Sequence, residues 1–345
     1  MKKDLKQLVR QFLEYMEIEK GRSVLTAKNY KFYLERFLGW GEINDPEKIT
    51  LEKVREYRLW LNRQVSHDGA PLQKNTQNYH LIALRKFLKY LSKMDVKSMA
   101  AEKIELAKTP ERQIEFLLKD ELERLLEAPL KHESTKTQKH KNNETLDAPP
   151  QSPAGDCGAG VKNTKTKKHV IQLRDKAILE LLFSTGLRVA ELVSLKRSNI
   201  SLKELDKDGV SEFTVRGKGS KLRIVFISKE AKSAVKNYLE ATSLSVSPFL
   251  FIRHDKAKQN GEQTGLTSRS VQRMIEKYAK ACGITKNVTP HTLRHSYATD
   301  LLINGADIRS VQSMLGHSSI TTTQIYTHIT DGQLKKVFSD FHDKS

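Results

Sequence analysis

Apolar side chains spaced three and four residues apart run through the N-terminal third of the chain. This spacing restricts the fold more than any other feature of the sequence, because it places those side chains along one face of a helix. Helices are predicted over about 5–20, 24–40, 51–65 and 75–93, with Thr50 as an N-cap and breaks at Gly21, Asp45-Pro46 and 68–71. Four amphipathic helices can bury one shared core, so residues 1–108 are expected to form an independent helical bundle.

Charge is the strongest global signal. The chain has 60 Lys and Arg against 41 Asp and Glu, a formal net charge of +19. A surplus of this size favours a polyanionic partner, and nucleic acid is favoured over a membrane surface or an acidic protein. Basic residues occur on both sides of residue 108, so both halves of the chain could contact the same polyanion.

Composition disfavours several classes of protein. The chain has 345 residues, enough for two ordinary domains. No stretch approaches about 18 consecutive apolar residues, so no transmembrane helix is predicted. The basic N-terminus has no apolar segment behind it, so no secretory signal is expected. Cys157 and Cys282 are too few for a disulfide framework or a cysteine-based zinc site. We expect a cytoplasmic protein.

The region after the bundle changes character twice. Residues 109–116, around Thr109-Pro110, predict an exposed linker, and 117–126 predict an amphipathic helix. Residues 131–168 are rich in Lys, Thr, Asn, Gly and Pro and poor in apolar side chains. Such a segment cannot bury enough surface to offset the entropy of ordering it, so a disordered insertion is predicted. The functional alternative is a basic arm that becomes ordered on DNA.

The rest of the chain predicts a second, mainly helical domain over 117–345. A helix is predicted over 174–195, with a break at Thr185-Gly186. Residues 212–217 and 222–227 alternate like paired strands around a short turn, which predicts a β-hairpin. Further helices are predicted over about 229–241, 267–281, 291–303, 307–315, 319–328 and 331–341.

The segment TPHTLRHSYAT, residues 289–299, holds the first candidate site residues. Thr289 can cap a helix that begins at Pro290, and His291 and Arg294 then share one face. An imidazole and a guanidinium at a helix N-terminus suit a phosphate, because the helix dipole and the Arg donors favour an anion. The alternative is a surface charge pair. His295 permits a zinc interpretation, which the missing glutamate of the zincin pattern makes weak.

Two further basic residues, Arg188 and Lys218, each have a structural and a functional interpretation. Arg188 follows the Thr185-Gly186 break, and Glu191 lies one helical turn later. The pair is either an ordinary intrahelical ion pair or a phosphate clamp that the carboxylate steadies. Lys218 lies at the hairpin tip, where a lysine is usually solvated, but from there it could also reach into a groove and protonate a leaving oxygen.

A tyrosine completes the set. Gly316 is predicted to end a helix, His317 follows it, and Tyr326 comes nine residues after His317. A single tyrosine is far more often a packing residue than a nucleophile. Its hydroxyl has a pKa near 10, so it needs nearby cations and a base before it can attack. Arg294, His291 and His317 would supply them.

The order and spacing of six residues resemble the tyrosine recombinase, or phage integrase, family: Arg188, Lys218, His291, Arg294, His317 and Tyr326. The surrounding segments FSTGLRVAELVSL and HTLRHSYATDLLINGADIRSVQSMLGHSSITTTQIYTH are similar to its bacterial Xer branch. The resemblance covers about 1–130 and 170–345 and leaves the 131–168 insertion unmatched. It implies an N-terminal four-helix, SAM-like core-binding domain and a mainly α catalytic domain with a small β-hairpin.

The resemblance also implies the chemistry. Tyr326 would attack a scissile DNA phosphate to give a 3′-phosphotyrosyl link and a free 5′-hydroxyl, without ATP, metal or cofactor. Arg188 and Arg294 would stabilise the phosphorane, and His317 would donate a hydrogen bond to it. His291 would be the general base, and Glu191 would orient Arg188. Lys218 would be the general acid, with Lys221 as the alternative because the hairpin register is open.

The resemblance further implies a clamp around double-stranded DNA that carries an inverted-repeat site. Donors near helix starts of the bundle, and comparable polar residues of the catalytic domain, are candidate DNA contacts, each of which could instead be merely solvated. They are Thr26, Lys28, Asn29, Lys74, Asn75, Gln77 and Asn78 in the bundle, and Lys221, Arg223, Ser268, Arg269 and Gln272 in the catalytic domain. The apolar face of the 331–341 helix would dock into a neighbouring subunit and give a cyclic tetramer on two sites, or fold back on its own domain.

Other functions remain open at this stage. Chromosome- or plasmid-dimer resolution and integration of a mobile element would use the same residues. So would DNA relaxation by a type IB topoisomerase. A non-catalytic DNA-binding protein is disfavoured because all six positions hold the required residue types. Neither the target sequence nor the need for a second recombinase in a hetero-tetramer, or for a septal DNA translocase, can be derived from the chain.

Overall fold

The computed structural model describes residues 4–65, 69–109, 115–131, 158–200, 205–206, 208–209, 211–217, 222–254 and 264–316. The chain divides into two compact units, Met1–Arg112 and Gln113–Ser345, and the boundary lies within the stretch where a linker is predicted. The described residues are mainly helical, with one two-stranded antiparallel sheet. None of their helices is long and apolar enough to cross a membrane.

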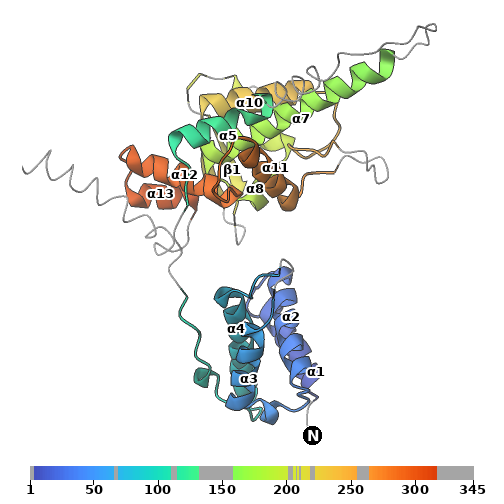
Figure 1. Ribbon diagram of the computed structural model, residues 1–345, viewed down its shortest axis with the longest axis vertical. Helices are drawn as coiled ribbons and strands as arrows, with labels where there is room; N and C mark the ends of the chain where they lie inside the picture. Colours follow the sequence, from blue (N-terminus) through green and yellow to red (C-terminus); the bar gives the residue numbers. More distant parts are fainter. Residues whose placement is uncertain are drawn as a thin grey trace, which may run out of the picture. The chain divides into compact units, whose positions relative to one another are not determined.

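The N-terminal unit contains four α-helices, as predicted (Figure 1). They are α1 (Leu5–Ile18), α2 (Val24–Trp40), α3 (Leu51–Asn62) and α4 (Lys74–Lys93), with 3-10 turns at Pro46–Lys48 and Ala101–Lys103. Side-chain caps begin three of them: Asp4 for α1, Ser23 for α2 and Thr50 for α3. The Thr50 cap confirms that sequence prediction.

The core of this unit comes from the predicted apolar faces. Phe12, Leu34, Phe37 and Phe87 are at most 1% exposed, and α4 packs against each of the other three helices. The helix α3 ends at Asn62 rather than near residue 65. The chain there leaves the helix to form an antiparallel bridge between Val65 and Pro71, and the Leu72 amide donates to the Gln64 carbonyl.

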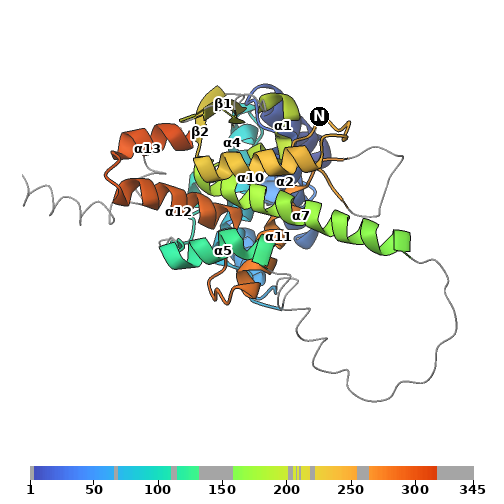
Figure 2. The ribbon, with the colours of Figure 1, turned by 90° about the horizontal axis from the view of Figure 1, so that it is seen from above.

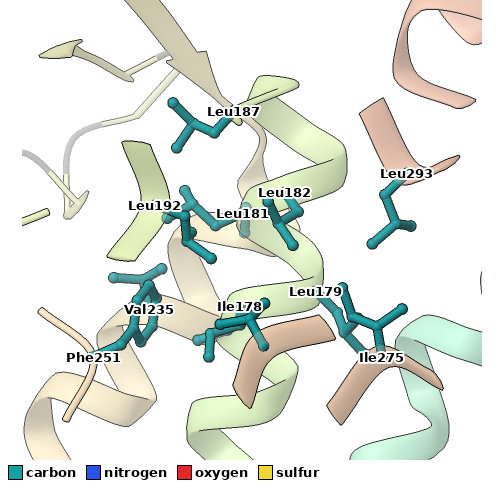
Figure 3. Packing of buried hydrophobic residues seen from close by; sticks show 14 of the residues in the cluster. Ile178, Leu179, Leu181, Leu182, Leu187, Leu192, Val235, Phe251, Ile275 and Leu293 are labelled. Atoms are coloured by element: carbon teal, nitrogen blue, oxygen red, sulfur yellow. The ribbon is translucent and has the colours of Figure 1, made fainter. Parts of the chain in front are cut away.

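The second unit is built around a central helix, α7 (Gly158–Thr185) (Figure 2). It packs against α5 (Lys119–Lys131), α10 (Lys229–Ala241) and α12 (Pro290–Ile303). The other elements are α8 (Val189–Ser194), a 3-10 turn at Arg197–Asn199, α11 (Ser268–Ala281) and α13 (Ile308–Leu315). Figure 3 shows the core, where Ile178, Leu181 and Leu182 of α7 meet side chains from several other helices.

Two element boundaries differ from the sequence prediction. The helix α7 begins at Gly158, inside the segment predicted to be a disordered insertion over 131–168, so that prediction is wrong for 158–168. Extending a helix that has already nucleated costs little, so polar composition does not prevent it. Residues 132–157 lie outside the described residues. The helix α5 runs from Lys119 to Lys131, past Pro129, and thus extends beyond the predicted 117–126.

The predicted hairpin is confirmed as β1 (Ser211–Arg216) and β2 (Leu222–Ile227), paired antiparallel from Ser211–Ile227 to Arg216–Leu222. The helices α7 and α13 pack against β2. Val225 and Ile227 are buried and the Arg223 side chain is only 10% exposed, whereas Leu222, Ile224 and Phe226 are exposed. The strand therefore turns its one charged side chain towards the interior of the unit.

Candidate active site

The N-terminus of α12 is fixed by a reciprocal cap. The Thr292 amide donates to Thr289 Oγ1 at 3.2 Å, and the Thr289 amide donates to Thr292 Oγ1 at 3.1 Å. Pro290 is the first helical residue, where its missing N–H costs nothing. These contacts confirm the predicted start of the helix. They place His291, which is exposed, one turn before Arg294, which is buried at 5% exposure.

Arg294 links three helices through backbone carbonyls. Its Nη1 donates to the Gly186 carbonyl just after α7, and its Nη2 donates to the Leu315 carbonyl at the end of α13, at 2.6 Å. A guanidinium is planar and always protonated, so two such contacts fix its plane. The residue predicted to bind phosphate is therefore held at the junction of α7, α12 and α13.

Both turns at this junction depend on glycine. Gly186 has φ +58° and Gly316 has φ +63°, a region that residues with a side chain seldom adopt. A Cβ at Gly186 would lie 2.5 Å from Cδ1 of Tyr297, and one at Gly316 would lie 2.8 Å from Cδ of Arg223. The predicted helix break after Thr185 and the predicted helix end at Gly316 are both confirmed.

Arg188 and Glu191 form the pair predicted from their spacing. Arg188 Nη1 donates to Glu191 Oε1 at 3.0 Å, and the Arg188 amide donates to Glu191 Oε2 at 2.9 Å. Arg188 Nη2 also donates to the Gly316 carbonyl at 3.3 Å. The side chain of Arg188 is 30% exposed, so its guanidinium is accessible to a ligand, whereas Glu191 is buried. The pair is more than a surface ion pair, because it adjoins the carbonyls that hold Arg294.

Arg223 also contacts Glu191, and the sequence did not indicate that its side chain lies inside the unit. Its Nη2 donates to Glu191 Oε2 at 2.8 Å. Burial lowers the pKa of Arg223, and the Glu191 carboxylate opposes that shift. It was predicted to contact DNA, but it lies inside the unit. The available signal was a single arginine within a strand, LRIVFI, whose other five residues are apolar.

We call Arg188, Arg223, Arg294 and Glu191 the arginine cluster. The Arg188 and Arg223 guanidiniums contact the Glu191 carboxylate, and the Arg294 guanidinium contacts the Gly186 and Leu315 carbonyls. Three cations against one carboxylate leave the cluster with excess positive charge at any pH at which Arg is protonated. Fixed cations of this kind stabilise negative charge that develops on a bound phosphate. The neighbouring Tyr297 is a packing residue: burial raises the pKa of its hydroxyl, which donates to Met314 Sδ at 3.6 Å.

Four predicted site residues lie outside the described residues: Lys218, Lys221, His317 and Tyr326. The predicted helices over 319–328 and 331–341 lie outside them as well. Within the described part of the chain, the structure brings together Arg188, Glu191 and Arg294, with His291 one turn from Arg294 on the same helix.

The predicted DNA contacts are distributed over the starts of three helices. Thr26, Lys28 and Asn29 lie in the first two turns of α2, and Lys74, Asn75 and Gln77 lie in the first turn of α4. Ser268, Arg269 and Gln272 lie in the first two turns of α11. Lys28, Asn29, Lys74, Asn75, Arg269 and Gln272 are exposed. All of them stay predictions as DNA contacts.

Two amides of α4 have structural partners. Gln77 Nε2 donates to the Leu72 carbonyl at 2.8 Å and to Asn62 Oδ1 at 3.2 Å, which fixes the connection from α3. Asn78 is buried, and its amide exchanges two hydrogen bonds with the backbone of Ala107. The prediction that Asn78 faces DNA is therefore wrong, because both of its polar atoms are used within the unit.

Comparison with known proteins gives consistent matches over nearly the whole chain. Residues 161–333 match the phage integrase family, and residues 9–94 match the phage integrase N-terminal SAM-like domain. The chain is 33% identical over 336 residues to tyrosine recombinase XerC of Thermodesulfovibrio yellowstonii, covering 97% of this chain and 95% of that protein. It is 32% identical to tyrosine recombinase XerD of Listeria innocua, covering 98% and 99%.

Solved structures share the fold. The XerH site-specific recombinase bound to palindromic difH substrate matches with a TM-score of 0.63 and 22% identity, covering 96% of this chain and 84% of that one. A λ integrase dimer bound to a core site matches with a TM-score of 0.61 and 17% identity, covering 94% and 95%. At these identities, the structural matches establish similarity of fold.

Proposed function

Because the chain belongs to the phage integrase family of tyrosine recombinases, we propose that its arginine cluster binds the scissile phosphate of a DNA recombination site. The protein is an Xer-like site-specific recombinase, an enzyme that breaks and rejoins DNA strands. The observation that carries the assignment of the site is the convergence of Arg188 and Arg294 on the adjacent carbonyls of Gly316 and Leu315. Two fixed guanidiniums there can contact the nonbridging oxygens of one phosphate.

The proposed reaction is a transfer of the phosphoryl group between two oxygens. The Tyr326 hydroxyl attacks phosphorus, its O–P bond forms, and the bond from phosphorus to the 5′-oxygen breaks. The negative charge on the phosphorane is met by Arg188 and Arg294, and Glu191 holds Arg188 in place. Because the phosphotyrosyl ester replaces a phosphodiester, the reverse step can rejoin a new strand without ATP.

Proton transfer is assigned to residues around the cluster. His291, exposed on the first turn of α12, takes the proton from Tyr326 and returns it in the reverse step. Lys218 donates a proton to the leaving 5′-oxygen, and Lys221 is the alternative donor. His317 donates a hydrogen bond to a nonbridging oxygen. The support for these roles is the sequence motif, together with the geometry of Arg294 and Arg188.

We further propose that two chains bind the arms of an inverted-repeat DNA site and that two such sites are joined by a tetramer, either of this chain alone or with a second recombinase. The support is similarity over nearly full length to XerC and XerD. The biological role proposed on this basis is resolution of chromosome or plasmid dimers. A septal DNA translocase is a candidate activator.

The covalent intermediate provides the decisive test. A nicked suicide duplex, carrying an inverted-repeat site selected for tight binding, would be incubated with wild-type protein, with Tyr326→Phe and with Tyr297→Phe. We expect a protein–DNA adduct on a denaturing gel for wild type and for Tyr297→Phe, and none for Tyr326→Phe. Tyr297→Phe is the matched control, because it removes one tyrosine hydroxyl, which donates to Met314 Sδ. An adduct with Tyr326→Phe would refute the assigned nucleophile.

A further inference from the structure

Arg223 is a buried cation on a strand of otherwise apolar residues. Its side chain is 10% exposed, while its neighbours on the strand, Leu222 and Ile224, are 66% and 51% exposed. Arg223 thus shares the inner face of the strand with the buried Val225 and Ile227, where a charged side chain is rarely found unless it is paired. This arrangement indicates that the guanidinium of Arg223 interacts with specific groups inside the unit.

The first contact of Arg223 is with the carboxylate that holds Arg188. Glu191 Oε1 accepts from Arg188 Nη1, and Glu191 Oε2 accepts from both the Arg188 amide and Arg223 Nη2. Arg188 is the N-cap of α8 and Glu191 lies in the first turn of that helix, so their mutual contacts fix nothing outside this short segment. Arg223 is the residue that ties this carboxylate to β2.

The second contact of Arg223 is with the turn that accepts from Arg188. A Cβ at Gly316 would meet Cδ of Arg223 at 2.8 Å and Nε at 3.0 Å, so the arginine stem packs directly against that glycine. The Gly316 carbonyl accepts from Arg188 Nη2. Arg223 therefore contacts both groups that hold the Arg188 guanidinium: the Glu191 carboxylate and the Gly316 turn.

The contacts of Arg223 leave part of its hydrogen-bonding capacity unused. Its Nε and Nη1 are buried, and neither has a hydrogen-bond partner among the residues that the structure describes. Burying a donor without a hydrogen-bond partner lowers the stability of the folded state. An apolar residue at this position would avoid that cost, so stability of the strand does not account for the arginine.

We propose that Arg223 is a positioning residue for DNA cleavage, which orients Arg188 towards the phosphate by holding Glu191 and the Gly316 turn. The inference rests on the proposed role of Arg188 in phosphate binding. Arg223 itself touches no reacting atom in this assignment. Its loss should slow the chemical step while leaving DNA affinity unchanged, because Arg188 remains present and charged but is no longer held.

A double-mutant cycle tests this inference. Single-turnover cleavage of the suicide duplex would be measured at saturating protein for wild type, Arg223→Met, Arg188→Met and the double variant. Methionine keeps much of the length and apolar character of the stem and removes the charge. We expect Arg223→Met to slow cleavage roughly 10- to 100-fold, as a displaced catalytic group does. The double variant should be no slower than Arg188→Met, because Arg223 acts only through Arg188.

Two results would overturn the inference. Multiplicative slowing in the double variant would show that Arg223 contacts the phosphate independently. Cleavage by Arg223→Met at the wild-type rate would show that the residue has no role in the reaction. Arg309→Met, which removes an exposed arginine on α13, is the matched control for loss of one positive charge. Equal dissociation constants for DNA, and equal unfolding temperatures by circular dichroism, separate positioning from loss of binding or of structure.

A charge-retaining variant covers the case in which Arg223→Met unfolds. Arg223→Lys keeps a cation near Glu191 but cannot also present a planar group to the Gly316 turn. We expect it to cleave at a rate between those of wild type and Arg223→Met, and to show the same lack of additivity with Arg188→Met. An adduct with wild-type protein establishes the proposed function independently, so its absence would refute that function rather than the role of Arg223.

Discussion

At the scale of single residues, Arg294 is defined by two backbone acceptors, one for each terminal nitrogen of its guanidinium. Its two terminal nitrogens donate to carbonyls of Gly186 and Leu315, which belong to segments far apart in the sequence. Only a planar, forked cation can make both contacts while staying charged. The same side chain thus joins three helices and carries the charge that the proposed reaction needs.

Replacement of Arg294 by lysine should therefore abolish function without removing charge. A single ammonium cannot satisfy both carbonyls and also contact a phosphate oxygen. We expect Arg294→Lys to cleave the suicide duplex at least about 100-fold more slowly than wild type, the scale seen when one preorganised donor is removed. Binding of intact DNA, measured by gel shift, should persist. Cleavage within a few-fold of wild type would refute the two-carbonyl role.

His80 gives the N-terminal unit a predictable response to acid. It is 2% exposed, its Nδ1 lies 2.9 Å from the Tyr57 hydroxyl, and its ring lies 4.5 Å from that of Tyr33. Burial, reinforced by the charge of Arg36, lowers the pKa of His80 from 6.5 to about 4. As the pH falls, His80 therefore binds a proton near pH 6.5 in the unfolded chain, but only near pH 4 in the folded unit.

Stability of this unit should fall as pH drops from about 6.5 to 4, because only the unfolded state gains the proton in that window. The full effect is roughly 3 kcal/mol, and about 2 kcal/mol by pH 5. Trp40 and Trp60 are the only two tryptophans of the chain, and both lie in this unit. Urea unfolding followed by tryptophan fluorescence should show the loss in wild type and less of it in His80→Gln. Equal pH dependence of the two proteins would refute the role of His80.

At the scale of elements, the α7–α8 connection sets the geometry of the cluster. The helix α7 ends at Thr185, and Gly186 turns the chain with φ +58° so that its carbonyl meets Arg294. The ring of Tyr297, on α12, fills the space where a side chain at Gly186 would be. Shape and backbone conformation both require glycine here.

Gly186→Ala should destabilise the catalytic unit by at least about 2 kcal/mol, since it combines a strained φ with a clash against an aromatic ring. Thermal unfolding by circular dichroism would measure this. In Gly186→Ala/Tyr297→Ser the clash is relieved but the strain remains, so the double variant should cost less than the sum of the two single changes. Gly283→Ala, also at positive φ but with open space around it, isolates the strain alone.

Local signals in the sequence were sufficient for much of this arrangement. The Thr289 cap, Pro290 at the first position of α12, the break after Thr185 and the helix end at Gly316 were all predicted, because capping and left-handed turns depend on neighbouring residues. These signals placed Arg294 and His291 on one helix face. They also placed Arg188 next to Glu191.

Contacts between distant segments could not be predicted in the same way. In the LRIVFI strand both faces are apolar apart from Arg223, so the period of two residues did not show which face is buried. Nor did any local pattern indicate that carbonyls at 186, 315 and 316 would hold the arginines. The start of α7 was missed because composition describes a segment's average tendency and not its attachment to a neighbouring helix.

At the scale of the whole molecule, the two compact units divide near the predicted linker, and the catalytic unit has a further segment, residues 132–157, outside its described structure. The arginine cluster is built from residues between 186 and 316. The contacts named for it are all made among described residues of that range.

Deletion of the segment should spare cleavage. Removing all of 131–168 would cut into α7, so the better variant replaces only residues 132–157 with a Gly/Ser linker. We expect adduct formation at a rate within about 3-fold of wild type, since the variant keeps every contact that the described residues make in the arginine cluster. Complete loss of cleavage in a variant with an unchanged circular dichroism spectrum would show that the segment belongs to the active assembly.

The C-terminal residues are expected to act between subunits. Deleting residues 332–345 should leave binding to a single DNA site intact and prevent ordered pairing of two sites, because the apolar face predicted over 331–341 would no longer dock into a neighbour. Gel shifts would measure binding, and light scattering would measure the mass of complexes on paired sites. Tetramers of normal mass with the truncated protein would contradict intersubunit docking.

Because Arg188 and Arg294 are held by backbone carbonyls, many substitutions around the site leave their acceptors unchanged. Every residue type carries a carbonyl, so a change at position 315 alters a side chain but leaves the acceptor for Arg294 in place. The positions of these acceptors are therefore determined by the path of the backbone and by the two glycines, Gly186 and Gly316, whose positive φ permits that path. The neighbouring side chains can therefore change widely while the carbonyl acceptors of Arg188 and Arg294 are kept. In diverged chains, two left-handed helix ends facing a pair of arginines would be a better signature than any particular set of neighbours.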